Sequence, residues 1–320
     1  MMRAQSTIAA ACLAFLAGCA APGGPANVAN AGPAGIPSQF DGADPAALVA
    51  DGKVWLYPTS DGNDLAAWSS EDNRHFTRAA TLLRIEDVSW IRDDGAPYHA
   101  LWAPHMAQAD GAYWLYFSVG PQNPTPSRIG VARCETPAGP CVDSGAPILT
   151  GGNGFEAIDP MVWIDPATGR RLFYAGGSAG ATLRVYEIGA DMAKLGQRID
   201  VDTPPNFTEG AWMHEHGGIY YMSYSQGRYD DATYTARYAT APSPTGPWTY
   251  RGVILQSDDT YKGPGHHAFF QDPDDGSWWI AYHRWEQPGD GPYRGVSRRV
   301  VVAPIRYDAD GLIIPVDMQE

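Results

Sequence analysis

The sequence is poor in positive charge. Its 320 residues carry 22 Lys and Arg against 36 Asp and Glu, which gives a formal net charge of −14. A protein that binds nucleic acid or an anionic membrane needs Lys and Arg to neutralise phosphates. The composition therefore excludes those partners as the main ones and favours a neutral substrate.

An apolar run long enough to cross a bilayer is lacking as well. The apolar stretch that follows Arg3 and ends at Cys19 has about 12 residues, which is too short for a membrane span and is typical of an export signal. Ala17 and Gly18 stand directly before Cys19. This matches the bacterial lipobox, in which the thiol receives a diacylglyceryl group and cleavage makes the cysteine the new N-terminus. A plain signal peptide with an accidental cysteine is the alternative.

This pattern predicts three segments. Residues 1–19 are expected to be a lipoprotein signal peptide, and residues 20–37, which are almost only Ala, Gly, Pro, Asn and Val, a flexible tether. Residues 38–320 then form the folded part, which is long for one ordinary domain but acceptable for a single all-β domain. We expect an exported monomer, lipid-anchored in the bacterial envelope at the periplasm or cell surface, that meets the membrane only through Cys19.

Cysteine is scarce. Two of the four cysteines fall in the expected signal, and the other two, Cys134 and Cys141, bracket a short loop. In an oxidising compartment such a pair forms a disulfide, worth roughly 2.5 kcal/mol in the chain-entropy model. A zinc pair is the less favoured alternative, because no second pair of Cys or His stands nearby at ligand spacing.

Aromatic residues, in contrast, are abundant, with eleven Trp and seventeen Tyr. This number suggests aromatic-rich surfaces of the kind that proteins place against the C–H faces of sugars. Packing in the core must nevertheless explain most of them.

An internal repeat indicates the fold class. The segments YWLYFSVG from Tyr113 and YYMSYSQG from Tyr220 lie 107 residues apart. Similar apolar-aromatic strands, each after a Gly- or Asp-rich turn, begin at residues 54, 113, 171, 220 and 278. Repeats of this length, with almost no helical periodicity, are typical of propeller blades. We expect an all-β, five-bladed β-propeller, because the alternative, a β-sandwich, does not explain a repeat through the whole domain.

The repeat brings polar side chains together. In a propeller, the strand before each aromatic strand is the innermost one and borders the central axis. In chain order, these strands carry Asp44, then Trp102 and His105, then Asp159, then Glu209, and finally His266 and His267. Asp44-Pro45, Ala103-Pro104 and Asp159-Pro160 occupy equivalent positions, so we expect three carboxyl groups to converge at one end of the axis.

Each acid alone has an ordinary explanation as a turn or loop residue. Together they indicate a catalytic site, because clustered buried acids destabilise each other's ionised form and would be a liability in a purely structural protein. Desolvation and a neighbouring carboxylate favour the protonated form of a carboxyl group, which suits Glu209 to deliver a proton to a leaving group.

At these residues the sequence resembles glycoside hydrolase family 43, five-bladed propeller enzymes that hydrolyse arabinofuranosides and xylosides with inversion. The resemblance covers roughly residue 40 to the C-terminus and rests on DGADPA, WAPHM, AIDPMVWID, TEGAWMHEHGGIYYMSYS, GPGHHAFF with WWIAYHRW, and RYDADGLIIPV, in this order. It implies Asp44 as the general base, Glu209 as the general acid and Asp159 as the acid that tunes and orients Glu209. Acid and base should then stand about 6.5 to 9.5 Å apart.

The resemblance also implies a metal contact. His266 matches the family histidine beside the axis, which in many members helps to hold a central calcium ion (Ca2+) directly or through water. Strand alternation should turn His267 away. The family pattern more often has Asn at the second position, so the assignment between the two histidines stays open. No organic cofactor is implied.

For the substrate, the resemblance implies Trp102 as an apolar wall of the sugar subsite. His105 would contact the substrate or simply pack. Arg298, or Arg299 in its place, would reach the sugar.

The expected protein is an inverting, exo-acting glycosidase that releases terminal pentofuranose units, above all α-L-arabinofuranose, from a plant polysaccharide or its oligosaccharides. A β-xylosidase or galactofuranosidase is the alternative inside this class. A non-catalytic carbohydrate-binding propeller is the alternative outside it.

Overall fold

The computed structural model describes residues 35–178 and 180–320. The expected signal peptide and nearly all of the expected tether, Cys19 included, therefore lie outside the described residues. The described chain is almost entirely β-strand, with one short 3-10 helix at Ile85–Asp87. No helix in the described ranges has the length and apolarity that a membrane crossing requires.

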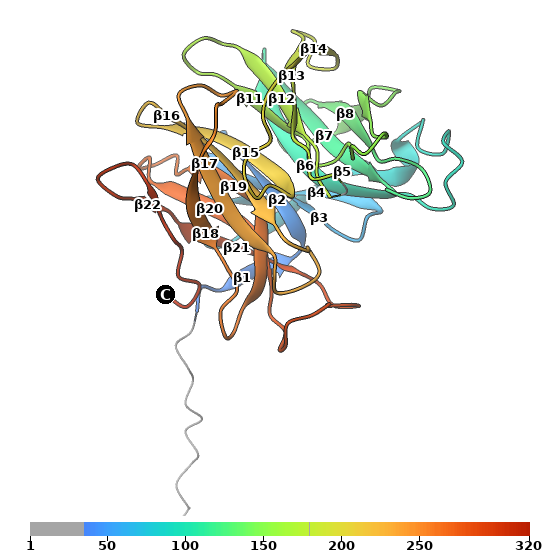
Figure 1. Ribbon diagram of the computed structural model, residues 1–320. Coiled ribbons are helices and arrows are strands. Elements are labelled where there is room, and N and C mark those ends of the chain that lie inside the picture. The colour runs from blue at the N-terminus through green and yellow to red at the C-terminus, as the bar shows by residue number, and fades with distance from the viewer. Residues whose placement is uncertain (1–34, 179) are drawn as a thin grey trace, which may run out of the picture. The chain divides into compact units, whose positions relative to one another are not determined.

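The strands form five antiparallel sheets, each one blade of a five-bladed β-propeller (Figure 1). Blade 1 consists of β2 (Ala43–Ala50), β3 (Lys53–Thr59), β4 (Asp64–Ser70) and β5 (Thr77–Arg84). Blade 2 consists of β6 (Ala100–Ala109), β7 (Ala112–Gly120), β8 (Arg128–Cys134), β9 (Cys141–Asp143) and β10 (Leu149–Thr150). Blade 3 consists of β11 (Met161–Ile164), β12 (Arg171–Ala175), β13 (Arg184–Ile188) and β14 (Leu195–Ile199).

Blade 4 consists of β15 (Glu209–His216), β16 (Ile219–Gln226), β17 (Thr235–Ala241) and β18 (Thr249–Leu255). Blade 5 consists of β19 (Lys262–Gln271), β20 (Trp278–Trp285), β21 (Arg299–Pro304) and β1 (Ser38–Asp41). A small hairpin of β22 (Arg306–Tyr307) and β23 (Ile313–Ile314) follows. The five aromatic strands found in the sequence are the second strands of the blades, which confirms the predicted fold class.

The first strand of each blade lies innermost. In ring order, β2, β6, β11, β15 and β19 each contact the next, and β19 contacts β2 again. Tight turns join first and second strands: both residues of Asp51-Gly52, Asp110-Gly111 and Gly217-Gly218 have positive φ, as a type I′ hairpin turn requires. The innermost strands therefore all run in the same sense, and their first residues gather at one end of the axis.

The N-terminal strand closes the ring, which the sequence did not reveal. β1 pairs antiparallel with β21 as the outermost strand of blade 5, with Asp41 opposite Arg299. The Phe40 ring stacks on Trp68 of blade 1, with centroids 3.9 Å apart. Blade 5 is thus built from both ends of the described chain, so closing the ring ties these ends together.

The second strands supply much of the core. Side chains such as Leu56, Leu115, Phe173, Met222 and Ile280 have no exposed surface. At the edge of blade 2, Cys134 and Cys141 stand opposite each other in β8 and β9 and form a disulfide. This confirms the predicted disulfide against the zinc alternative.

Candidate active site

Five residues at the same place around the ring share an unusual backbone conformation. Their φ angles are positive, and four of them are not glycine: Asp44 (48°), Ala103 (41°), Asp159 (55°), Gly210 (66°) and His266 (37°). Residues with a side chain rarely adopt this conformation, and such strain clusters at functional sites. The register shifts beside these residues in β2, β6, β15 and β19. The equivalence proposed for Asp44, Ala103 and Asp159 therefore extends to all five blades.

Hydrogen bonds between neighbouring blades hold four of these bends. The backbone N–H of the bent residue donates to a side chain of the second strand in the preceding blade. The pairs are Asp44 with Nδ1 of His283 (3.1 Å), Ala103 with Oγ1 of Thr59 (2.7 Å), Asp159 with Oγ of Ser118 (2.9 Å), and His266 with Oγ of Ser225 (2.8 Å).

The junction between blades 3 and 4 differs from the other four. Gly176, whose N–H donates to the carbonyl of Ile158, stands where the other blades have their linking side chain. The N–H of Gly210 donates instead to Oδ2 of Asp159, over 2.9 Å. Asp159 thus accepts the hydrogen bond that a second-strand side chain accepts at the other four junctions.

Asp44 is held in its ionised form. It is only 8% exposed, and Nη1 of Arg298 donates to its Oδ1 over 2.9 Å. Burial alone would raise the pKa of this carboxyl, but the charge of Arg298 and smaller contributions from His266, His283 and Thr59 outweigh it. The pKa of Asp44 therefore lies well below its usual range.

Two histidines flank Asp44, and both are neutral near pH 7. Nδ1 of His283 accepts the N–H of Asp44, which leaves the ring proton on Nε2. Nδ1 of His266 lies 3.5 Å from Oδ1 of Asp44 and 3.6 Å from Oδ2 of Asp159. Burial lowers the pKa of both histidines. Their contacts with Asp44 are therefore not ion pairs, and Arg298 supplies the balancing charge.

The surroundings of Asp159 shift its pKa in the opposite direction from that of Asp44. It is 7% exposed, and burial, followed by the charges of Glu209 and Asp44, raises its pKa well above the usual range. The N–H of Gly210 and the charge of Arg298 oppose this rise only in part. Asp159 therefore retains a proton to a higher pH than Asp44 does.

Glu209 is the first residue of β15, one position before the bent residue Gly210. It is 8% exposed and accepts two hydroxyl hydrogen bonds of 2.7 Å, from Tyr234 to Oε1 and from Ser178 to Oε2. The Tyr234 ring in turn stacks on His283, with centroids 5.6 Å apart. These contacts fix the orientation of the carboxyl group.

Trp102 stands at the place in β6 that Glu209 holds in β15, because Trp102 pairs with Ser118 and Glu209 with Ser225. Its partly buried ring fits over Gly120, where an added Cβ would fall 2.0 Å from the ring. Trp102 is therefore at the same end of the axis as the three acids.

His105 lies deeper in the ring. It is 4% exposed, and its ring packs 5.4 Å from the ring of Trp212 and 6.4 Å from that of Tyr116. Burial lowers the pKa of His105 to about 4. No hydrogen bond joins it to the acids among the described residues. This surrounding matches the packing alternative rather than contact with a sugar at the acids.

The two arginines have separate surroundings. Arg298 binds Asp44 and holds its guanidinium 5.6 Å from the ring centre of Tyr229. Arg299 binds Ser38 and Asp41 of β1. Arg298 is thus the one at the acids, and Arg299 fastens the strand that closes the ring.

The residues around His266 do not form a direct calcium site. Calcium takes six to eight oxygen ligands, and no group of three or more His, Cys, Asp or Glu side chains in the described ranges is arranged to hold a metal ion. The Asp44 oxygen nearest to His266 already accepts from Arg298. His267 packs against Phe269 with ring centroids 5.5 Å apart and points away from the acids.

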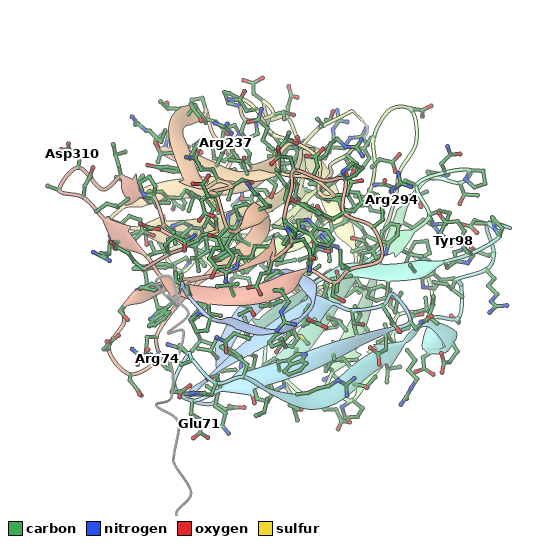
Figure 2. All side chains as sticks on the ribbon, turned by 90° about the horizontal axis from the view of Figure 1, so that it is seen from below. Glu71, Arg74, Tyr98, Arg237, Arg294 and Asp310 are labelled. Carbon is green, nitrogen blue, oxygen red and sulfur yellow. A yellow bond between two sulfur atoms is a disulfide. The ribbon has the colours of Figure 1, made fainter. Side chains whose placement is uncertain are left out.

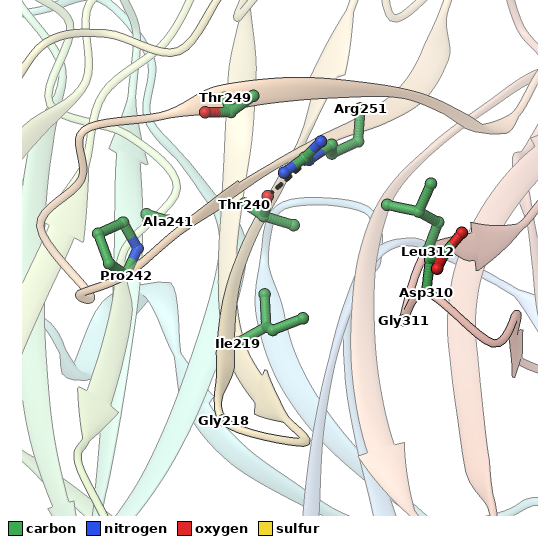
Figure 3. Close-up of a pocket in the computed structure, with 10 residues that line it drawn as sticks. All are labelled: Gly218, Ile219, Thr240, Ala241, Pro242, Thr249, Arg251, Asp310, Gly311 and Leu312. Carbon is green, nitrogen blue, oxygen red and sulfur yellow. Dashed lines mark hydrogen bonds between the residues drawn. The ribbon is translucent and has the colours of Figure 1, made fainter.

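One hollow lies away from the acids. About 490 Å³ in volume, it lies beside β16, β17 and β18 and the turn of the C-terminal hairpin, and Figure 3 shows Arg251 bonded to Thr240 at its wall. A second hollow of about 420 Å³ is lined by Ala43, Thr59, Tyr229 and Arg298, among others. It lies beside Asp44, because Ala43 precedes Asp44 in the chain and Arg298 binds it. The second is the one that a substrate of the acid cluster would enter.

Sequence reasoning missed Ser118, Ser178, Ser225, Tyr234 and His283. Thr59, Ser118, Ser225 and His283 each lie toward the end of an aromatic strand. The repeat of a polar residue there was a signal that could have been found. Ser178 and Tyr234 lie in loops outside the repeat.

A carboxylate that stays ionised near a carboxyl group that retains a proton is what acid-base cleavage of a glycosidic bond requires. The propeller and these groups define a glycoside hydrolase. The family model for "Glycosyl hydrolases family 43" matches residues 37–313. The chain belongs to this family, whose members hydrolyse with inversion.

Relatives with known names are also glycosidases. A β-D-galactofuranosidase of Aspergillus niger is 36% identical over 76% of this chain and 73% of its own length. A xylosidase/arabinosidase of Bacteroides ovatus is 30% identical over 86% of this chain and 94% of its own. The crystal structure of a β-xylosidase/α-arabinofuranosidase from a compost metagenome, with xylotriose and in a calcium-free form, has 28% identity and a TM-score of 0.70 over 88% of this chain and 96% of that one.

Proposed function

We propose that the protein is an exo-acting α-L-arabinofuranosidase. Asp44 is the base that activates water, Glu209 is the acid that protonates the leaving oxygen, and Asp159 positions Glu209 and tunes its proton affinity. The observation that carries the proposal is the contrast between Asp44, ionised by Arg298, and Asp159, whose raised pKa lets it keep a proton next to Glu209.

The choice of sugar rests on two of the relatives at 30% identity or more. One is named for galactofuranose, and the other for xylose and arabinose. β-D-Galactofuranose and α-L-arabinofuranose have the same configuration at their four ring carbons and differ in the exocyclic chain. Arabinofuranose is therefore the sugar ring that both names have in common.

The enclosure of the acids supports exo action. Asp44, Asp159 and Glu209 are at most 8% exposed, so a chain end can reach them more easily than the middle of a polysaccharide can. The substrate would be a terminal arabinofuranose on a plant polysaccharide or oligosaccharide. Trp102 would form the apolar wall beside the sugar, and Arg298 would stand between the sugar and the base.

Product analysis by NMR on arabinan and arabinoxylan oligosaccharides tests this function. Release of β-L-arabinofuranose as the first product, with no larger fragment, is expected for inverting exo action. Appearance of internal fragments would contradict it. A panel of nitrophenyl glycosides separates the alternatives, because a higher kcat/KM on the β-xyloside or the β-D-galactofuranoside would reassign the sugar.

Glu209→Gln separates catalysis from mere sugar binding. Its kcat on an arabinofuranoside with a poor leaving group should fall about 100- to 10,000-fold, which is the usual contribution of a general acid, and much less on one with a good leaving group. Glu187→Gln, at an exposed ion pair with Arg170 on β13, is the matched control. Unchanged activity of Glu209→Gln on the poor substrate would refute the assignment.

A galactofuranosidase is the second candidate, favoured by the 36% identity with the Aspergillus niger enzyme. The extra carbon of galactofuranose must then fit beside the ring. The hollow of about 420 Å³ next to Arg298 offers that space.

A further inference from the structure

The two oxygens of the Glu209 carboxyl group have hydrogen-bond partners of different kinds. Oε1 accepts from the hydroxyl of Tyr234 and Oε2 from that of Ser178, each over 2.7 Å. Tyr234 has no exposed surface, whereas Ser178 is partly exposed and lies between β12 and β13. One oxygen is therefore held from inside the protein, and the other by a side chain that also contacts solvent.

The surroundings of Tyr234 leave it no room to move away from Oε1. Its ring stacks on His283 with centroids 5.6 Å apart, and it lies against Gly265, where an added Cβ would fall 2.5 Å from two ring atoms. His283 is fully buried and accepts the N–H of Asp44. Moving the tyrosine would break the packing between blades 4 and 5 next to the base. We therefore expect the contact at Oε1 to remain when a sugar binds.

Ser178 belongs to a short segment that passes very close to Glu209. An added Cβ on Gly177 would fall 2.4 Å from the Cβ of Glu209, so only glycine allows this approach. Ser178 itself has a φ of 47°, which residues with a side chain rarely adopt and which is typical of functional sites. Its hydroxyl makes no other hydrogen bond among the described residues. The backbone thus places this hydroxyl on Oε2, and a single hydrogen bond keeps it there.

The oxygen of Ser178 stands where a leaving oxygen has to stand. A general acid must come within about 2.6–3.2 Å of the atom it protonates, and Oγ of Ser178 lies 2.7 Å from Oε2 of Glu209. A proton on Oε2 is donated to one acceptor at a time, so the serine and the glycosidic oxygen compete for it. After proton transfer, the released alcohol can donate its O–H to the carboxylate as the serine does.

We propose that Ser178 is a positioning residue that holds Oε2 of Glu209 in the free enzyme and gives up this contact to the glycosidic oxygen when the substrate binds. The proton then passes from Oε2 to the glycosidic oxygen, which keeps the electron pair of its broken bond to the anomeric carbon. The attacking water forms the new bond to that carbon and gives its proton to Asp44. Ser178 is chemically unchanged and returns to Oε2 when the alcohol leaves. Only the roles of Glu209 and Asp44, and not the choice of sugar, rest on the proposed function.

The pH profiles of Ser178→Ala test this exchange. The alkaline limb of kcat/KM reports the acid in the free enzyme, and that of kcat reports it in the complex with substrate. A hydroxyl that donates to a carboxylate favours its ionised form, so the loss of this hydroxyl should move a limb to higher pH by about one unit. Ser178→Ala should therefore move the alkaline limb of kcat/KM and leave that of kcat in place.

Tyr234→Phe provides the comparison. It keeps the ring on His283 but removes the hydroxyl from Oε1, a contact expected with and without substrate, so both alkaline limbs should move. The substrate for all variants is an alkyl glycoside of the preferred sugar, because its poor leaving group makes protonation limit kcat. Ser144→Ala and Tyr98→Phe remove exposed hydroxyls elsewhere and are the matched controls, with Tyr98 at the margin of the molecule in Figure 2. Both limbs should stay in place in these controls.

The outcomes separate this inference from the proposed function. If Tyr234→Phe moves both limbs and Ser178→Ala moves both or neither, the exchange is refuted and Glu209 remains the acid. If Tyr234→Phe moves neither limb, the alkaline limb does not belong to Glu209, and the proposed function and the exchange fail together. Ser178→Gly, which also removes the hydroxyl and relieves the positive φ, replaces Ser178→Ala if that variant does not fold, with the same expected profiles.

Discussion

The backbone N–H of Gly210 donates to Oδ2 of Asp159. Because Gly210 directly follows Glu209, this bond links the two acids Asp159 and Glu209 through the backbone. At the equivalent junctions of the ring, a side chain of the preceding second strand accepts this N–H. Because blade 3 has Gly176 in that place, Asp159 takes over the structural role. The same hydrogen bond that joins blades 3 and 4 therefore sets the spacing of Asp159 and Glu209.

Asp159→Asn tests this double role. The amide oxygen can still accept from Gly210, so folding should be retained, but the carboxyl group that keeps a proton beside Glu209 is lost. Asp159 has a raised pKa and can supply a proton up to a higher pH than an ordinary carboxyl group, whereas Asn cannot supply one at all. The alkaline limb of the kcat/KM profile should move to lower pH, and kcat should fall about 100-fold. An alkaline limb that stays in place would contradict the coupling.

Arg298→Gln tests the charge that holds Asp44 ionised. Arg298 is the largest contribution opposing the burial of Asp44, so its removal should raise the pKa of Asp44. Since the base must be ionised, the acid limb of kcat/KM should move to higher pH, with a loss of about 100-fold near neutral pH. Arg299→Gln, at the ring closure, should keep the profile. If both substitutions moved the acid limb equally, Arg298 would have no specific role in keeping Asp44 ionised.

The fold was predictable because it repeats. Five aromatic strands at even spacing indicated five blades, and Asp44 and Asp159 were found because both precede proline at equivalent positions. The structure brings these two acids together, with His266 within 3.6 Å of each. Glu209 belongs to the same cluster but stands one residue before the bent position, which Asp44 and Asp159 occupy in their own blades. The sequence hid this offset because the bent residue of blade 4 is Gly210, which has no side chain to compare.

Other parts of the site had no local signal. The four residues of β1 show no alternation that indicates an edge strand. Their partner β21 lies at the other end of the described chain, so no local pattern links the two strands. Tyr234 reaches Glu209 from the loop directly before β17. Contacts of this kind depend on how distant segments pack, and a periodic pattern in one segment cannot predict them.

Cys19→Ala tests the expected lipid anchor. Without the thiol no diacylglyceryl group can be attached, so the protein should move from the membrane fraction to the soluble fraction after cell lysis, with kcat/KM unchanged. Cys12→Ala removes the other cysteine of the same apolar stretch and should leave the protein on the membrane. Retention of the Cys19 variant on membranes would leave the lipobox interpretation without support.

His105→Phe tests the cost of burying neutral histidines. A histidine of the unfolded chain takes up a proton near pH 6.5, whereas burial lowers the pKa of His105 to about 4 in the folded protein. Between these values the unfolded chain holds one more proton, so the stability contributed by neutral His105 is complete above pH 6.5 and is lost as the pH falls toward 4. Over this window His105→Phe should reduce the slope of the free energy of unfolding by about 1.4 kcal/mol per pH unit.

Urea denaturation at a series of pH values measures that slope. Met106→Leu is the matched control, because Met106 is 1% exposed and has no titratable group; its slope should equal that of the unmodified protein even if its stability at neutral pH is lower. His214 and His267 are also buried with lowered pKa values. The free energy of unfolding of His105→Phe should therefore still fall with acid, with a slope smaller by the contribution of one proton. If His105→Phe and Met106→Leu had the same slope, His105 would titrate alike in the folded and unfolded chains and could not be buried in the ring as a neutral group.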